Sequence, residues 1–167
     1  MTNNKIYIFD TTLRDGAQTQ GVDFSIDDKI KIAHALDDLG VDYIEGGWPG
    51  ANPTDTEFFQ KNTNLKNSIM TAFGMTKKVG RSADNDPGLS SILNSNTRAV
   101  CLVGKTWDFH VDVALGISKE ENLENISEST KLFVKEKKEF MFDAEHFFDG
   151  FKNNKEYTLS CIKAAYD

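Results

Sequence analysis

Short apolar runs alternate along this chain with longer segments that have the period of a helix. The apolar runs cover residues 5–9, 41–44, 68–73, 99–103 and 139–142. Each run is followed by a segment rich in polar, glycine and aromatic residues, and then by a predicted helix. Repeated β-loop-α units of this kind pair into a parallel sheet with right-handed crossovers. The pattern therefore predicts an α/β fold.

Capping residues mark the ends of two of the predicted helices. Ser25 is placed to cap the first helix, which Gly40 ends in the position favoured for a left-handed cap. Ser118 and Glu121 have the spacing of a capping box at the start of the fourth helix. Shorter or weaker helical segments are expected at residues 56–61, 86–93 and 155–165.

Two architectures fit five βα units, namely an open doubly wound sheet and a (β/α)8 TIM barrel. The segments after the strands are long and those after the helices are short, as in barrel enzymes. No GxGxxG follows the first run, which weakens the dinucleotide-binding alternative. A complete barrel has eight units and about 250 residues. We therefore expect residues 1–167 to form the N-terminal part of a TIM barrel, with only the first five βα units and with open edges at strands one and five.

The composition argues against several classes of function. A net charge of −7 disfavours a basic nucleic-acid-binding surface, and no apolar run approaches the roughly 20 residues that cross a bilayer. The N-terminus, MTNNKIYIFD, has no apolar signal-peptide core. Cys101 and Cys161 each lie in an apolar stretch and are expected to be buried structural thiols. We predict a cytoplasmic protein with neither nucleic-acid nor membrane partners.

The segment FDTTLRDG at the end of the first run contains an Arg–Asp pair with a clear chemical use. Asp15 offers a carboxylate to a hard divalent cation, and Arg14 offers a fork of donors to a carboxylate or a developing enolate oxygen. Gly16 would let the backbone approach closely. A surface ion pair with an Asp cap explains the same residues, so their chemistry alone leaves both interpretations open.

A family resemblance decides between these interpretations. FDTTLRDGAQ, followed by YIEGGWPGANPTD, resembles the metal-dependent barrel lyases and synthases that include 2-isopropylmalate synthase, homocitrate synthase, citramalate synthase and hydroxymethylglutaryl-CoA lyase. The later segments FGMTKK, LVGKTWDFHV and FDAEHFFDGFK look most like the citramalate synthase branch. The resemblance covers nearly the whole chain. It implies that residues 1–167 are the N-terminal part of a pyruvate-carboxyltransferase-like catalytic domain.

The resemblance also implies a reaction and roles for individual residues. The enzyme would be an acyltransferase that condenses acetyl-CoA with a 2-keto acid, converting pyruvate to citramalate in isoleucine biosynthesis. Arg14 would stabilise the alkoxide that develops on the keto oxygen, and Asp15 would bind the divalent metal, Mg²⁺ or Mn²⁺. Glu145 would position the keto acid or transfer a proton. Glu45 would bind near the metal or orient Arg14, unless it is only a strand-end carboxylate paired with a lysine.

Other residues of the loops after the strands are weaker candidates for substrate binding. Gln18 is expected to line the pocket. His146 would donate a proton or hydrogen-bond a residue that contacts the substrate, and His110 would do the same. A purely structural role explains both histidines as well. A group of basic residues would either contact CoA phosphates or be ordinary solvated charge. This group consists of Lys77, Lys78, Arg81 and Lys105.

One part of the family pattern is absent from the sequence. The family completes its metal site with a His-x-His pair on a later strand, whereas this chain contains only His34, His110 and His146. We therefore expect no useful synthase activity from the 167-residue chain alone. It would be a truncated part of a longer, homodimeric enzyme, one half of a split barrel, or a repurposed fragment. The alternatives in function are a 2-isopropylmalate synthase, then a hydroxymethylglutaryl-CoA lyase, or a non-catalytic half-barrel that needs a partner chain.

Overall fold

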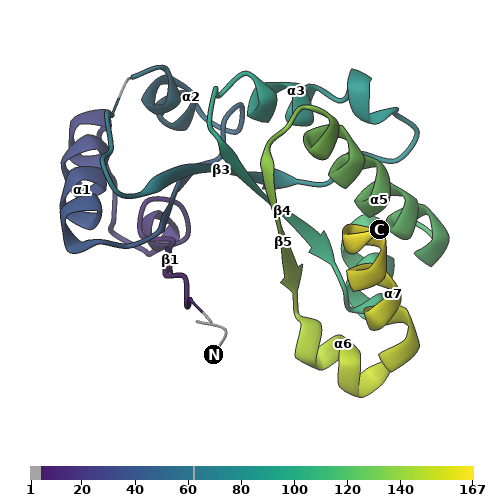
Figure 1. Cartoon of the computed structure of the whole chain (residues 1–167). Helices are drawn as coiled ribbons and strands as arrows, with labels where there is room; N and C mark the ends of the chain where they lie inside the picture. The colour runs from purple at the N-terminus through teal and green to yellow at the C-terminus, as the bar shows by residue number, and fades with distance from the viewer. Residues whose placement is uncertain (1–4, 62) are drawn as a thin grey trace.

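The computed structural model describes residues 5–61 and 63–167, which form a single parallel sheet in the order β1-β2-β3-β4-β5. The sheet curls, and its concave side is open between β1 and β5 (Figure 1). This arrangement confirms the expected partial barrel of five βα units. The strands are β1 (Phe9–Asp10), β2 (Tyr43–Gly47), β3 (Ile69–Met75), β4 (Ala99–Lys105) and β5 (Glu139–Glu145).

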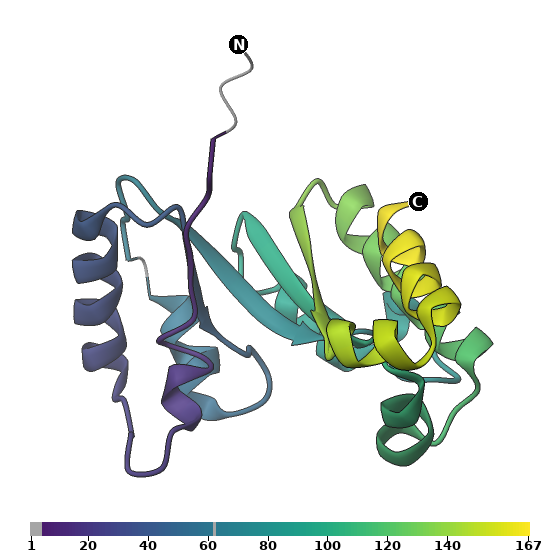
Figure 2. The same cartoon turned by 90° about the horizontal axis from the view of Figure 1, so that it is seen from below.

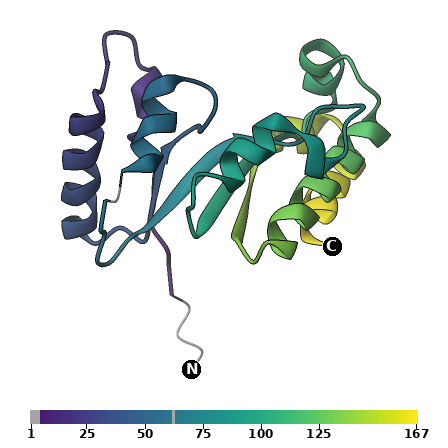
Figure 3. The ribbon, with the colours of Figure 1, turned by 90° about the horizontal axis from the view of Figure 1, so that it is seen from above.

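The main helices lie around the outer, convex side of the sheet (Figures 1 and 3). They are α1 (Ile26–Leu39), α2 (Pro53–Gln60), α3 (Pro87–Leu93), α5 (Lys119–Lys135) and α7 (Lys155–Tyr166). Short helical segments occupy the loops after the strands, namely η1 (Gly16–Gln18), η2 (Ala83–Asn85), α4 (Asp108–His110), η3 (Val111–Leu115) and α6 (Phe147–Asn153). No helix in the described parts of the chain has the length and apolar character needed to cross a bilayer.

The predicted helix ends are confirmed. The Ser25 side chain accepts from the backbone N–H of Asp28, whose carboxylate accepts in return, which completes a capping box at the start of α1. Gly40 ends the same helix with φ of 88° in the left-handed region. Ser118 and Glu121 form the second capping box, at the start of α5.

The first strand is much shorter than predicted, and this part of the sequence interpretation is wrong. Ile6, Tyr7 and Ile8 are more than half exposed, at 82%, 58% and 54%, and only Phe9 and Asp10 pair with β2. The Ile8 carbonyl still accepts from the backbone N–H groups of Asp42 and Tyr43 at 3.0 Å, so the pairing with β2 ends at Ile8 and an apolar composition alone does not extend it. The other strands are longer than predicted, and the loops after β4 and β5 contain helical segments that the sequence did not indicate.

The two faces of the sheet carry different side chains. On the convex face, Val100 and Leu102 are fully buried against Leu89, Ile92 and Phe133 of the surrounding helices. On the concave face, Phe73, Cys101 and Val103 pack with Trp48 and Met141. Side chains alternate between the faces of a strand, so inward-facing residues of neighbouring strands form a continuous floor below the carboxyl ends of the strands.

One irregularity interrupts the pairing of β2 with β3. Glu45 pairs with Thr71, but the next pair is Gly47 with Ala72, so Gly46 is an extra residue on β2. A Cβ on Gly47, whose φ is 148°, would lie 2.6 Å from the carboxyl carbon of Asp55. Glycine is therefore required where the bulge brings β2 against the start of α2.

Candidate active site

A tight turn after β1 presents Arg14 and Asp15 at the carboxyl end of the sheet. The backbone N–H groups of Arg14, Asp15 and Gly16 all donate to the Thr11 carbonyl, at 2.9–3.1 Å. Leu13 is fully buried and anchors the turn in the core. A Cβ on Gly16 would meet no atom closer than 3.8 Å, so the packing within this chain does not explain the glycine that the sequence analysis linked to close backbone approach.

Two carboxylates and an aromatic ring hold the guanidinium of Arg14. Its Nε donates to Oε2 of Glu45 at 2.7 Å, and its Nη1 donates to Oδ1 of Asp15 at 3.1 Å. The carbon of the guanidinium lies 3.8 Å from the centre of the Phe73 ring, in a cation–π contact. The structure thus brings together the predicted Arg14, Asp15 and Glu45, and of the two roles predicted for Glu45 it supports the orienting of Arg14.

The Glu45 carboxylate lies in a low-dielectric part of the site. Its side chain is 1% exposed, and burial raises its pKa while the hydrogen bond from Arg14 opposes that shift. Cys101 lies on the same face, and burial raises the pKa of its thiol above the usual range. The thiol is therefore a neutral packing group, as expected, and Cys161 is buried as well.

A buried ion pair between α1 and α2 lies next to the end of β2 and fixes this part of the site. The ammonium group of Lys29 pairs with Asp55 and also donates to the Gly46 carbonyl at 3.0 Å. The other oxygen of Asp55 accepts from the backbone N–H of Trp48 at 2.8 Å. An adjacent cavity of about 320 Å³ is lined by Arg14, Gln18 and residues of this network, so the predicted Gln18 lies beside Arg14. Sequence reasoning missed Lys29 because its partner is distant in the chain.

The ends of β4 and β5 form a second group of predicted residues. Lys105 and Glu145 are paired in the sheet register, and their side chains form an ion pair. The Thr106 hydroxyl donates to the Glu145 carbonyl at 2.7 Å, which fixes the end of β5. Lys105 therefore contacts the candidate catalytic carboxylate, whereas the sequence analysis considered it only for CoA phosphates or as solvated charge.

His110 and His146 meet at the carboxyl ends of the strands, which we call the mouth of the sheet. Their rings are 4.5 Å apart, edge to face, and both contact the ring of Trp107. Oδ2 of Asp149 lies 3.1 Å from Nδ1 of His146 and accepts its N–H when that nitrogen carries the proton. His146 has φ of 54°, a left-handed conformation that costs a non-glycine residue about 1–3 kcal/mol. The two predicted histidines thus belong to one aromatic cluster beside Glu145.

Asp143 is a site residue that the sequence analysis did not single out. It lies two residues before Glu145 on β5 and shares its concave face with Met141. Burial raises its pKa, with Arg14 opposing and Glu145 and Asp15 adding to the shift. The alternation of FMFDAE, which places Asp143 and Glu145 on one face, was the signal that could have found it.

The predicted basic rim is only partly available to a ligand. Lys77 is buried, donates to the Arg81 carbonyl at 2.9 Å and pairs with Glu128 at 3.1 Å, so its charge is used within the fold. Lys78 and Arg81 are exposed and border a cavity of about 890 Å³ between the loops after β2, β3 and β4. These two residues remain candidates for contact with an anionic ligand.

The described residues do not complete a metal site. Asp15 is exposed and has the hard oxygen ligands that Mg²⁺ or Mn²⁺ prefers. However, no three His, Cys, Asp or Glu side chains converge within residues 5–61 and 63–167 in a way that could hold a metal ion. Asp15 can therefore supply one ligand of a metal site, and the described residues do not supply the remaining ligands.

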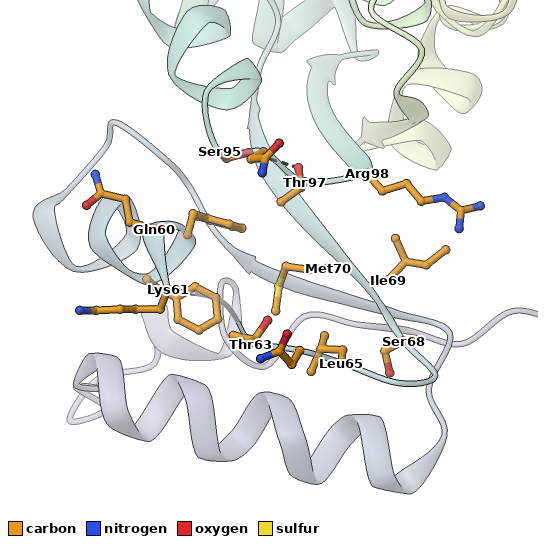
Figure 4. Close-up of a pocket in the computed structure, with 14 residues that line it drawn as sticks. Gln60, Lys61, Thr63, Leu65, Ser68, Ile69, Met70, Ser95, Thr97 and Arg98 are labelled. Atoms are coloured by element: carbon orange, nitrogen blue, oxygen red, sulfur yellow. Dashed lines mark hydrogen bonds between the residues drawn. The ribbon is translucent and has the colours of Figure 1, made fainter.

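Another cavity, of about 680 Å³, lies at the opposite ends of the strands (Figure 4). It is bordered by Met70, Leu65 and the exposed Arg98, between α2 and the start of β4. In a parallel sheet this is the amino-terminal end of the strands, whereas barrel chemistry occurs at the carboxyl end. None of the predicted site residues borders this cavity.

Comparisons with known proteins agree with the fold and with the family resemblance of the sequence. The profile of the HMGL-like family matches residues 5–166. Over 163 residues, 96% of this chain, the sequence is 51% identical to an (R)-citramalate synthase from Aquifex aeolicus, of which it covers 31%. It is 32% identical to a 2-isopropylmalate synthase from Sulfolobus acidocaldarius, over 100% of this chain and 41% of that protein.

A solved structure supports the architecture. The HMG-CoA lyase from Brucella melitensis superimposes with a TM-score of 0.71 at 13% identity, over 95% of this chain and 58% of that one. At this identity the likeness concerns the fold alone. The chain thus spans less than half the length of the two synthases and a little over half of the lyase chain.

Proposed function

The chain belongs to the HMGL-like family, and we propose that it supplies the Arg14 side of the active site of a citramalate synthase-like acyltransferase. Enzymes of this family are generally metal-dependent and use acetyl-CoA. One observation carries the proposal, namely the guanidinium of Arg14 held over Phe73 by Glu45 and Asp15. Because the chain covers 31% of the Aquifex aeolicus relative, the activity is proposed for the enzyme as a whole.

The proposed reaction condenses acetyl-CoA with a 2-keto acid, and with pyruvate it yields citramalate. A guanidinium has five N–H donors, of which two are bonded to Glu45 and Asp15 in the described structure. The remaining donors can bind the carboxylate of the keto acid or stabilise the negative charge that develops on its keto oxygen. Glu45 keeps the guanidinium in place, because the Glu45 carboxylate is buried and accepts from Nε of Arg14 at 2.7 Å.

Further properties follow as parts of the proposal. Asp15 is the candidate ligand for Mg²⁺ or Mn²⁺, with the other ligands supplied from outside the described residues. Lys78 and Arg81 border a cavity of about 890 Å³ that suits the phosphates of CoA. We place the enzyme in isoleucine biosynthesis and expect a homodimer. We also propose that the 167-residue chain alone lacks useful synthase activity, because it has no His-x-His.

A fusion protein tests the proposed function. The chain would replace the matching 163-residue region of the Aquifex aeolicus synthase, and release of CoA from acetyl-CoA would be measured with pyruvate. We expect turnover by the fusion and none by the chain alone. A fusion that folds but does not release CoA would contradict the proposal. Faster turnover with a larger, branched 2-keto acid would instead favour the 2-isopropylmalate synthase reaction.

Substitutions of Arg14 make the test specific to the site. In the fusion, Arg14→Met is expected to lower kcat by about 10²–10³-fold, the usual effect of removing one donor to an oxyanion. Arg14→Lys keeps the charge but loses the fork, so it should restore only a small part of the activity. Arg98→Met is the matched control at the opposite end of the strands, where 75% of the Arg98 side chain is exposed, and should leave kcat unchanged.

One observation favours the non-catalytic alternative, a half-barrel that binds a partner chain. Ile6, Tyr7 and Ile8 are 82%, 58% and 54% exposed beside β1, which is an unusual amount of apolar surface next to a strand. Size-exclusion chromatography of the chain distinguishes the two cases. A stable, well-folded monomer would contradict the need for a partner, whereas a dimer at low concentration would support it.

A further inference from the structure

Asp143 lies between the two groups of charged residues that form the mouth of the sheet. Its electrostatic neighbours are Arg14 and Asp15 from the loop after β1, Glu45 from β2, Lys105 from β4, and Glu145 from its own strand. The thiol of Cys101 also faces it from β4. Figure 2 shows the first two units on one side and the units of β4 and β5 on the other, with β3 crossing between them.

The carboxyl group of Asp143 is available to a ligand. Within residues 5–61 and 63–167 it forms no hydrogen bond and no ion pair, although its side chain is half-buried. The cations nearest to it already have carboxylate partners, since Arg14 binds Glu45 and Asp15, and Lys105 binds Glu145. A half-buried acid without a partner is costly, and such groups are typical of functional sites.

The environment of Asp143 differs from that of Glu145, although they share one face of β5. Glu145 is bound by the ammonium group of Lys105, so its carboxylate already has a partner, which that of Asp143 lacks among the described residues. Burial raises the pKa of Asp143 above that of a free aspartate. Such a carboxylate accepts protons more readily than an ordinary one. Two neighbouring carboxyl groups in different environments are a recurrent basis for separate roles in acid–base catalysis.

We propose that Asp143 is a further catalytic residue, the base that removes a proton from the methyl group of the acyl thioester. The C–H bond breaks, its electron pair forms the C=C bond of the thioester enolate, and the proton moves to Asp143. The enolate carbon then attacks the keto carbon, whose C=O electron pair moves to the oxygen and takes up a proton to give the alcohol, and water hydrolyses the thioester to release CoA. This inference rests on the proposed condensation and assigns to Glu145 the positioning of the keto acid.

Hydrogen exchange tests the assignment directly. The fusion protein is incubated in D₂O with acetyl-CoA, and deuterium incorporation into the methyl group and CoA release are both measured. Asp143→Asn should slow both rates by about 10²-fold or more, with KM for pyruvate changed less than about three-fold. Asp143→Glu should recover part of the exchange. Glu139→Gln, on the same face at the other end of β5, is the matched control and should exchange at the normal rate.

Two results would overturn the inference. One is deuterium exchange by Asp143→Asn within about three-fold of the parent fusion, and the other is a change confined to KM for pyruvate, which would indicate binding alone. A parent fusion without activity would contradict the proposed function, and a separate measurement then decides on Asp143. The carboxyl carbon of Asp143 is titrated by NMR in the 167-residue chain, where a midpoint at the value of free aspartate would also overturn the inference.

Discussion

In the first two βα units, buried charged groups join the elements, whereas neutral hydrogen bonds join α5 and α7 to each other and to the end of β4 in the last two units. Lys29 pairs with Asp55 between α1 and the start of α2, and the Asp37 carboxylate accepts three backbone N–H groups from residues 66–68 at 2.6–2.8 Å. In the last units, the Asn122 amide donates to the Tyr157 hydroxyl at 2.7 Å and the Thr158 hydroxyl donates to the Thr106 carbonyl at 2.9 Å.

This difference has consequences for stability. A buried charge without its partner lowers stability much more than an unpaired neutral group does. The charge loses its hydration and also loses the Coulomb attraction of its partner. The contacts of Lys29 and Asp37 in the first units should therefore respond strongly to single substitutions or to pH, and the neutral contacts of Asn122 and Thr158 in the last units should respond weakly. The same fixed charges keep Glu45 and the bulge of β2 in place, so the side of the mouth that holds Arg14 is formed before any ligand binds.

Lys29→Met would give the largest effect. It leaves the Asp55 carboxylate buried without its cation, so we expect a loss of about 3–5 kcal/mol in the free energy of unfolding, measured in urea. Lys31→Met is the matched control, because Lys31 is an exposed residue of the same helix, and it should change stability by less than about 0.5 kcal/mol. Similar losses of unfolding free energy in both variants would show that the Lys29–Asp55 ion pair does not stabilise the first two units.

Asp37→Asn should produce a smaller loss that depends on pH. Burial alone would raise the pKa of Asp37, but the backbone N–H groups of residues 66–68 lower it from 3.8 to about 2. The lowered pKa stabilises the fold above pH 3.8, and this contribution disappears as the pH falls to about 2.

At pH 7 the variant should lose about 1–2 kcal/mol, and it should approach the parent protein in strongly acidic solution. The measurement is the free energy of unfolding between pH 7 and the acid transition. Asp38→Asn, at an exposed position on the same helix, serves as the control. A loss for Asp37→Asn that is constant over this range would mean that the charge of Asp37 is irrelevant to its hydrogen bonds.

Tyr157→Phe should have the smallest effect and should sharpen the contrast. It removes a neutral hydrogen bond to Asn122, which contributes about 1 kcal/mol. Burial raises the pKa of the Tyr157 hydroxyl above its usual range, so the loss should be the same at every pH from acid to neutral. Tyr166→Phe, at a residue that is 89% exposed, should be neutral. A strongly pH-dependent loss for Tyr157→Phe would break the comparison between the two regions.

Local signals in the sequence predicted the helices well. Ser25, Gly40 and Ser118 act on backbone groups within a few residues, so their roles are visible without a fold. The first strand was overpredicted because an apolar run says nothing about whether a neighbouring strand is present to pair with it. Only Phe9 and Asp10 form register pairs with β2, and the Ile8 carbonyl adds one hydrogen bond from Tyr43.

The candidate site was predicted in part for a similar reason. Arg14, Asp15 and Glu45 lie in motifs that resemble a known family, and the structure brings them together. Lys29 was missed because its partner Asp55 is 26 residues away and a lysine in a helix is usually solvated. Asp143 has no side-chain partner among the described residues, so its importance emerges only from the charges that surround it on its own strand and on three other elements.

The extra residue in β2 constrains how this sequence can change in length. Gly46 shifts the alternation of the strand by one position, so that both Glu45 and Trp48 lie on the concave side, where Trp48 packs against Phe73 at 5.6 Å. One further inserted residue would turn Trp48 to the other face of the sheet, whereas deleting Gly46 would remove the bulge together with the carbonyl that accepts from Lys29. Insertions and deletions between Glu45 and Trp48 should therefore be rejected during evolution, even though this segment lies at the start of a loop, where changes in length are usually tolerated.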